Sequence, residues 1–243
     1  MKLDGKIALI TGAAHRLGKS IALALADQGC DLMIHFNQAE EAAAETAEQA
    51  QSLGVRAVIV GADLSQTEGV HEVFRAIDSA YGRIDLLANS AAILERRDIL
   101  EVDEEDWRRT IGLNLKGAFF VLQEAARRMR SAGGGAVVNI SDSAGHRPWK
   151  EFPLHSISKA SLDMLTQAAA LALAPEIRVN AVVPGPTLKP PWMPDKRWNE
   201  VTGKIPLRQA VPTHNVAEAV VFLMTNEYIT GHSLRVDGGD LLT

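Results

Sequence analysis

Several features that direct proteins to particular environments are scarce or missing in this sequence. It has one cysteine, Cys30, so it cannot form an internal disulfide, and we interpret that residue as a small packed side chain. The formal net charge is −5 and there is no basic block, so we predict neither a nucleic acid nor a membrane as partner. No apolar run reaches membrane-spanning length, and the first residues, MKLDGKIALITG, lack a signal-peptide pattern. We therefore expect a soluble cytoplasmic protein.

What the sequence does contain is a regular alternation of short apolar runs with stretches of helical periodicity. The chain has 243 residues, of which 47% are hydrophobic, enough for one sizeable core. The apolar runs are mostly continuous, which is typical of strands buried on both faces of a parallel sheet. Strands are predicted over residues 6–11, 31–36, 56–63, 84–91, 135–141, 177–185 and 233–239. We predict one α/β domain over 1–243, a Rossmann-type, doubly wound, seven-stranded parallel sheet with helices on both faces.

One stretch interrupts this alternation. Residues 184–204, PGPTLKPPWMPDKRWNEVTGK, follow the sixth predicted strand, and their prolines exclude a strand or a long helix at the start of the segment. The segment carries two of the four tryptophans, Trp192 and Trp198. A long proline-rich loop at the carboxyl end of a strand is a candidate substrate lid.

A glycine-containing turn, TGAAHRLG at 11–18, joins the first predicted strand to the first helix. Gly12 lets the chain turn sharply, and Gly18 lets the helix begin close to the sheet. The free N–H groups at the amino end of the helix would then face a phosphate group. Such turns are common, but the position of this one in the first strand–helix unit predicts a dinucleotide site.

Further motifs follow in order along the whole chain. They are Asp63-Leu64, ANSAA at 88–92, Asn114 in NLKG, the pair His155 and Lys159, PGPT at 184–187 and VDGG at 236–239. With the glycine turn, this set resembles the short-chain dehydrogenase/reductase family from end to end. Within that family, RLG at 16–18 resembles the pteridine-reductase-like branch. The resemblance implies an oxidoreductase that uses a nicotinamide dinucleotide.

The resemblance and the strand-end positions together predict the residues of the cofactor site. Asp63-Leu64 would contact the adenine, residues 89–91 would line the adenosine side, and residues 184–187 would flank the nicotinamide and pyrophosphate. The alternative for these residues is simple strand-end capping. The predicted set is Gly12, His15, Arg16, Leu17, Gly18, His35, Phe36, Asn37, Asp63, Leu64, Asn89, Ser90, Ala91, Lys159, Pro184, Gly185 and Thr187.

Charge at the end of the second strand predicts which dinucleotide binds. A site for NAD places a carboxylate there, which binds the ribose 2′-hydroxyl and would repel a 2′-phosphate. This chain has His35, Phe36, Asn37 and Gln38 instead. Arg16, with His15 in the adjacent turn, can face a 2′-phosphate, so we predict NADP(H). The alternative is that Arg16 is solvated and neither cofactor is strongly preferred.

The family catalyses its reaction with Asn, Ser, Tyr and Lys, and this chain keeps two of the four. Asn114 and Lys159 match, whereas the serine position falls on Asp142 and the tyrosine position on His155. An aspartate at this position is a second mark of the pteridine-reductase-like branch, and it can supply a proton if its pKa is raised. No metal is predicted in this site.

His155 leaves two interpretations open. Histidine can act as a general acid near neutral pH, because its ordinary pKa of about 6.5 lies far below that of tyrosine. A nearby Asp142 would favour the imidazolium, and Lys159 would oppose it. The alternative is that His155 fills space in a dinucleotide-binding homologue, a sensor or partner subunit, that has lost its catalyst. Retention of Lys159 and Asn114 favours an enzyme.

The substrate and the assembly are predicted more broadly. We expect a small molecule, either pterin-like or a carbonyl compound. The residues after NSAA, Ile93 to Arg96, include no aromatic side chain on which a pterin could stack, and Trp149, Phe152 and Trp192 could line the pocket instead. An oligomer is predicted, because the helix at 156–174 is apolar around most of its circumference, and the family resemblance implies a homotetramer. The alternative is a deeply buried helix in a monomer.

Overall fold

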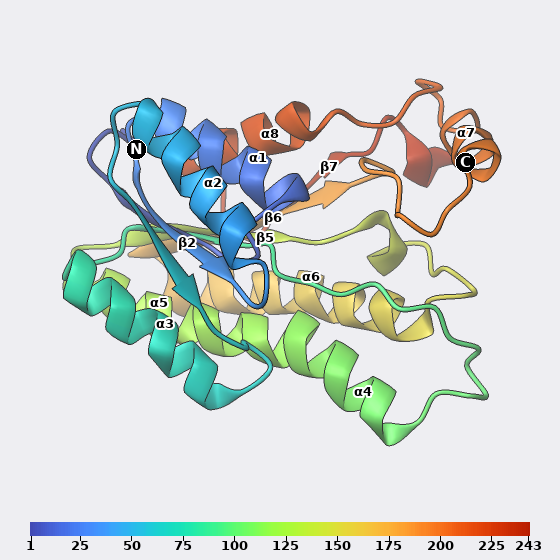
Figure 1. Cartoon of the computed structure of the whole chain (residues 1–243), viewed down its shortest axis with the longest axis horizontal. Coiled ribbons are helices and arrows are strands. Elements are labelled where there is room, and N and C mark those ends of the chain that lie inside the picture. Colours follow the sequence, from blue (N-terminus) through green and yellow to red (C-terminus); the bar gives the residue numbers. More distant parts are fainter.

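The computed structural model describes all 243 residues as one doubly wound sheet with helices on both faces (Figure 1). Its seven strands are all parallel, in the order β3-β2-β1-β4-β5-β6-β7. Their bounds are β1 Ile7–Ile10, β2 Asp31–Phe36, β3 Ala57–Gly61, β4 Leu86–Asn89, β5 Gly135–Ile140, β6 Ile177–Pro184 and β7 Ser233–Val236. The predicted fold class and all seven strands are confirmed, with most strands shorter than their apolar runs.

Eight α-helices connect and cover the strands. Helices α1, α2 and α8 lie on one face of the sheet, and α3, α5 and α6 lie on the other (Figure 1). The bounds are α1 Arg16–Asp27, α2 Glu40–Ser52, α3 Thr67–Ala80, α4 Glu104–Ile111, α5 Ala118–Ser131, α6 Pro153–Leu173, α7 Asp195–Thr202 and α8 Thr213–Thr225. A π-helical segment, Gly112–Gly117, joins α4 to α5. No helix combines the length and the apolarity that crossing a membrane requires.

The core consists of two apolar layers separated by the sheet. One layer places Ile21 and Leu25 of α1 and Val220 of α8 against side chains from one face of the strands. The other places Phe74 of α3 and Val121 of α5 against the opposite face. Because both faces are covered, the central strands have no solvent-facing side chains, and this explains their continuous apolar runs.

The topology places the candidate site at the carboxyl ends of the strands, which form one side of the sheet. Strand β1 lies between β2 and β4, so the chain order reverses beside β1 and leaves a crevice at the carboxyl ends of β1 and β4. The segment 184–204 follows β6 at the same edge. It is irregular up to Pro194 and then forms the short helix α7, as its proline content indicated.

Candidate active site

The turn between β1 and α1 has the shape of a phosphate cradle. Gly12 adopts a left-handed φ of +66°, and a Cβ atom at this position would lie 2.9 Å from Cα of Ala91. A Cβ on Gly18 would lie 2.2 Å from the carbonyl oxygen of Gly12. Both glycines are therefore required by close backbone contacts. They leave the amino end of α1 open toward the crevice, and this arrangement fits a dinucleotide pyrophosphate.

The ends of β1 and β4 are joined through one hydroxyl group. Oγ1 of Thr11 accepts hydrogen bonds from the backbone N–H groups of Ser90 and Ala91, at 2.9 and 3.0 Å. The side chain of Asn89 points inward, where its amide donates to Oδ1 of Asn139 and to the carbonyl of Ala118, each at 3.1 Å. Ser90 and Ala91 thus lie beside the cradle, whereas the side chain of Asn89 joins β4 to its neighbours.

His35 supports the cradle from below. Its Nδ1 accepts a hydrogen bond from the backbone N–H of Gly12 at 3.1 Å, so Nε2 carries the proton and donates to the carbonyl of Ala62 at 2.9 Å. Burial lowers the pKa of His35 to about 4. The sequence placed His35 among cofactor contacts, but the structure shows both ring nitrogens engaged inside the protein. Of the neighbouring residues, Phe36 is buried and Asn37 is exposed.

Arg16 and His15 are exposed at the tip of the turn. Arg16 has a φ of +55°, a left-handed conformation that is uncommon for a residue with a side chain. Its Nη2 donates to the carbonyl of Leu188 at 3.2 Å. The guanidinium therefore connects the cradle to the segment 184–204, a contact that no local sequence pattern indicates.

The remaining cofactor positions lie along the same edge. Asp63 is exposed after β3, and its Oδ1 accepts from the N–H of Ser65 at 2.9 Å, while Leu64 is buried. Pro184, the last residue of β6, is buried, and Oγ1 of Thr187 donates to the carbonyl of Gly185 at 2.9 Å. Leu17 is half-buried in the first turn of α1. These positions lie at the carboxyl ends of three strands of one sheet, β1, β3 and β6.

Asn114 is fixed by three hydrogen bonds. It lies in the π-helical segment, and its Oδ1 accepts from the N–H of Ile93 at 2.9 Å. Its amide nitrogen donates to the carbonyl of Ile93 at 3.0 Å and to Oγ of Ser158 at 3.1 Å. The side chain therefore binds the loop after β4 to the start of α6. Local π-helical geometry is frequent at functional sites.

Lys159 is buried one turn of α6 beyond His155. Its Nζ donates to the carbonyl of Ile140 at 2.7 Å, at the end of β5. Burial lowers the pKa of this amine, and the carboxylates of Asp142 and Asp163 oppose the shift. The structure thus brings a buried cation to the carboxyl edge of the sheet beside Asp142.

His155 and Asp142 face each other in the centre of the site. Nε2 of His155 lies 3.6 Å from Oδ2 of Asp142, and this nitrogen is buried without a hydrogen-bond partner. Oδ1 of Asp142 accepts from the N–H of Ala144 at 2.8 Å, which leaves Oδ2 toward the histidine. Ser141 and Ser143, the neighbours of Asp142, are both buried, and all three residues lie beyond the end of β5. The four predicted catalytic side chains are therefore brought together.

Aromatic side chains continue the site from His155 toward segment 184–204. The indole of Trp149 stacks on the His155 ring, with centroids 6.1 Å apart and an interplanar angle of 22°. Phe152 contacts Trp149 edge-on and stacks on Trp192 at 5.8 Å. The three aromatics that the sequence offered as pocket residues thus form one chain of contacts.

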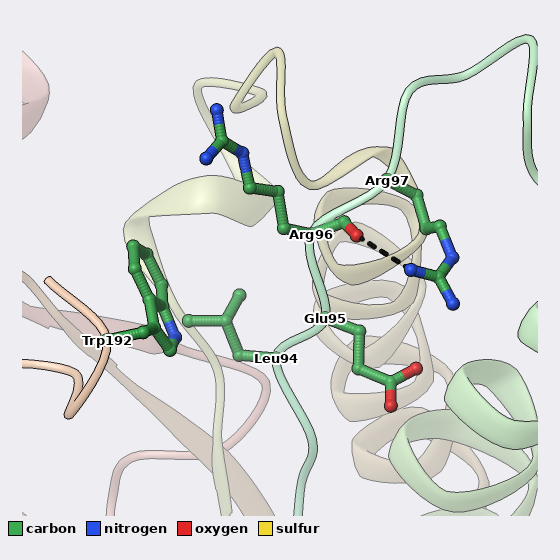
Figure 2. Close-up of a pocket in the computed structure, with 5 residues that line it drawn as sticks. All are labelled: Leu94, Glu95, Arg96, Arg97 and Trp192. Carbon is green, nitrogen blue, oxygen red and sulfur yellow. Dashed lines mark hydrogen bonds between the residues drawn. The ribbon is translucent and has the colours of Figure 1, made fainter.

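A pocket of about 400 Å³ opens between Trp192 and the loop after β4. It is lined by Leu94, Glu95, Arg96, Arg97 and Trp192, and Figure 2 shows the side chain of Leu94 extending toward the indole of Trp192. The charges on this loop are already paired: Glu95 with Arg109, Arg96 with Glu151, and Arg97 with Asp106. The pocket wall is therefore mixed, with Leu94 and Trp192 beside three charged side chains that already have ion-pair partners.

Comparisons with known proteins match this geometry. A family model described as Enoyl-(Acyl carrier protein) reductase matches residues 12–240. The uncharacterized oxidoreductase YohF of Escherichia coli is 37% identical over 243 residues, covering 98% of this chain and 96% of that protein. The cradle, the Rossmann sheet and these matches define an oxidoreductase that uses a nicotinamide dinucleotide. The chain belongs to the short-chain dehydrogenase/reductase family.

Two solved structures are also similar over nearly the whole chain. The crystal structure of acetoin dehydrogenase YohF from Salmonella typhimurium has a TM-score of 0.90 and 34% identity, and the match covers 98% of each chain. FolM, alternative dihydrofolate reductase 1 from Brucella canis, complexed with NADP, has a TM-score of 0.94 and 30% identity. That match covers 100% of this chain and 96% of the other.

Proposed function

We propose that the protein is an NADP(H)-dependent reductase of a small carbonyl or pterin-like compound, in which His155 takes the place of the usual tyrosine. The assembly of Asn114, Asp142, His155 and Lys159 beside the dinucleotide cradle carries this proposal. Two of these residues depart from the family pattern, yet they face each other at 3.6 Å. This pairing of a buried histidine with a partly exposed carboxylate at the carboxyl ends of the strands supports a role in proton transfer.

The proposal assigns the proton to His155. When bound, the reduced dinucleotide supplies the hydride that adds to the carbonyl carbon. Nε2–H of the His155 imidazolium gives its proton to the carbonyl oxygen, and the product is the alcohol. The Asp142 carboxylate stabilises the imidazolium electrostatically, and Lys159 would bind the ribose of the dinucleotide. Leu94, Trp149 and Trp192 would exclude water from the substrate.

The preference for NADP(H) is part of the same proposal. Arg16 and His15 are exposed at the cradle, and the end of β2 offers no carboxylate to repel a 2′-phosphate. The FolM structure was obtained with NADP, which supports this choice. Arg16 would bind the 2′-phosphate while remaining in contact with the carbonyl of Leu188.

Two substrate classes are supported by different observations. Asp142 and Arg16 are the marks of the pteridine-reductase-like branch, and the FolM relative is named a dihydrofolate reductase. The similar structure named acetoin dehydrogenase favours a small hydroxyketone. The pocket, in which Leu94 and Trp192 lie beside charges that already have ion-pair partners, suits a small uncharged carbonyl compound at least as well as a pterin.

Turnover assays test the proposal directly. Purified protein is given NADPH with a panel of small ketones, hydroxyketones such as acetoin, and dihydropteridines, and the loss of NADPH absorbance is followed. We expect turnover with at least one class, and its loss in a Lys159→Met variant. Tight NADPH binding without turnover across the panel would instead favour the alternative, a dinucleotide-binding homologue that has lost catalysis. Activity gained by His155→Tyr in an inert parent would support the same alternative.

A homotetramer is also proposed, with a face of α6 as one of its contacts. Ile157, Met164 and Leu171 are exposed by 44%, 61% and 86% and recur every seven residues, so they lie on one side of the helix. Ala168 and Ala172 are exposed between them and would allow a second helix to approach closely. Ala169 and Ala170, by contrast, are buried in the core.

A further inference from the structure

His155 is connected to Asn114 at two points, its ring and its backbone. On the ring side, the carbonyl oxygen of Ile93 lies 3.1 Å from Nδ1 of His155 and accepts from the Asn114 amide at 3.0 Å. On the backbone side, the hydroxyl of Ser158 accepts from the same Asn114 amide at 3.1 Å and donates to the carbonyl of His155 at 2.7 Å. The four residues therefore form a closed ring of hydrogen bonds.

The partner of Nδ1 decides where the imidazole carries its proton. A carbonyl oxygen can only accept a hydrogen bond, so Nδ1 of His155 must be the protonated nitrogen. In the neutral ring Nε2 is then bare. This is the nitrogen that is buried without a hydrogen-bond partner and that lies 3.6 Å from Oδ2 of Asp142. Any proton that the ring gives to a substrate must be the one on Nε2.

The ring cannot easily exchange its two edges. Trp149 stacks on one face, and a half-turn of the ring would place a carbon atom against the carbonyl of Ile93. The Ile93 peptide is itself held at both its N–H and its carbonyl by the Asn114 side chain, at 2.9 and 3.0 Å. The orientation of that carbonyl therefore depends on Asn114.

We propose that Asn114 is a positioning residue that fixes the tautomer of His155 through the peptide of Ile93. The inference rests on the proposed function, in which His155 supplies the proton. Neutral His155 is held as the Nδ1–H tautomer, so the Nδ1–H bond to Ile93 persists in both charge states. Only Nε2 gains and loses a proton, at the position between Asp142 and the substrate pocket. Free histidine favours the opposite tautomer, so the prediction is specific.

Nuclear magnetic resonance of protein labelled with ¹⁵N in its histidines tests the proposal without substrate or cofactor. Two-bond ¹H–¹⁵N spectra are recorded in alkaline buffer, where histidine side chains are neutral, and His155 is assigned with a His155→Gln variant. We expect a pyrrole-type shift for Nδ1 and a pyridine-type shift for Nε2. In Asn114→Ala the Ile93 peptide is released, so the pattern should move toward the Nε2–H tautomer. Turnover should fall about tenfold to a hundredfold, as misplaced catalytic groups do.

Two further variants keep the test decisive. Asn114→Asp retains the size of the side chain but, as a carboxylate, cannot donate to Ile93, so it should also shift the tautomer if Asn114→Ala does not fold. Ser158→Ala is the matched control, because it removes one bond of the same ring but leaves Ile93 clamped, and the Nδ1–H pattern should persist. An Nε2–H tautomer in the parent protein would overturn the proposal, as would an unchanged pattern in both Asn114 variants. A parent with the Nδ1–H pattern and no turnover would refute the proposed function alone.

Discussion

At position 155 the proposed chemistry depends on one imidazole that is shorter than a phenol and enclosed by Trp149, Asp142 and Ile93. His155→Ala should lower turnover by about two orders of magnitude or more, the usual scale for removal of a general acid. NADPH affinity, measured by equilibrium titration, should stay nearly constant because the cradle is untouched. Turnover equal to that of the parent would mean that the proton comes from Asp142 or from water.

In His155→Tyr, activity should persist to higher pH, since phenol keeps its proton to a higher pH than imidazolium does.

Arg16 carries the second prediction at this scale. Arg16→Ala should weaken NADPH binding by roughly tenfold to a hundredfold, the range for one charge-assisted hydrogen bond, and should affect NADH much less. The loss of the contact with the carbonyl of Leu188 would act on both cofactors alike, so the ratio of the two affinities isolates the 2′-phosphate. Calorimetric titrations of both cofactors measure that ratio. Equal losses would assign Arg16 to the turn or to the shared pyrophosphate.

His35 gives a prediction about stability rather than activity. Its pKa is lowered from 6.5 to about 4 by burial, so the unfolded chain binds the proton more readily. Neutral His35 contributes fully to the free energy of unfolding above pH 6.5. This contribution, roughly 3 kcal/mol at most, is lost as the pH falls toward 4. Urea unfolding across this range should show a steeper loss for the parent than for His35→Gln. The exposed His71→Gln should behave like the parent, and parallel curves for parent and His35→Gln would contradict the assignment.

At the scale of elements, the apolar face of α6 should control assembly. Leu171→Glu places a charge at a position that is 86% exposed in the single chain and is proposed to be buried between copies. Sedimentation velocity at micromolar concentration should show the parent as a tetramer and the variant as a smaller species. Leu53→Glu, at the end of α2 on the other face of the sheet, is the control and should remain assembled. A monomeric parent would refute the proposal outright.

The sequence predicts the elements well where their pattern is local. Continuous apolar runs predict all seven strands, because both faces of the sheet are covered. The sequence is less informative where tertiary contacts decide a boundary. Helix α6 begins at Pro153, three residues before the predicted start, so His155 belongs to its first turn. The π-helical segment that orients Asn114 has no local signal, since its hydrogen bonds to Ile93 and Ser158 join distant parts of the chain.

The site as a whole divides in the same way. Motif spacing identifies Asn114, Asp142, His155 and Lys159, and the structure brings them together. The sequence does not reveal which ring nitrogen of His155 is engaged, nor that His35 supports the cradle. Both facts depend on carbonyl groups, of Ile93 and Ala62, that every residue possesses and that only the fold can place. Side-chain identity is visible in a sequence, whereas the direction of a backbone carbonyl is not.

For the whole molecule, the position of β1 has a consequence for how the chain folds. Strand β1 lies between β2 and β4 in the sheet, and β4, which begins only at Leu86, is synthesised well after β1. Until then β1 presents an unpaired, wholly apolar edge, Ile7 to Ile10, which is prone to pair with other chains. No strand pair in the sheet is a local hairpin, so refolding from urea should be slow, on the order of milliseconds to seconds or longer. The refolded yield should fall as protein concentration rises. Recovered NADPH binding would measure the yield, and light scattering would measure the aggregates. A yield independent of concentration would show that the exposed edge is protected early.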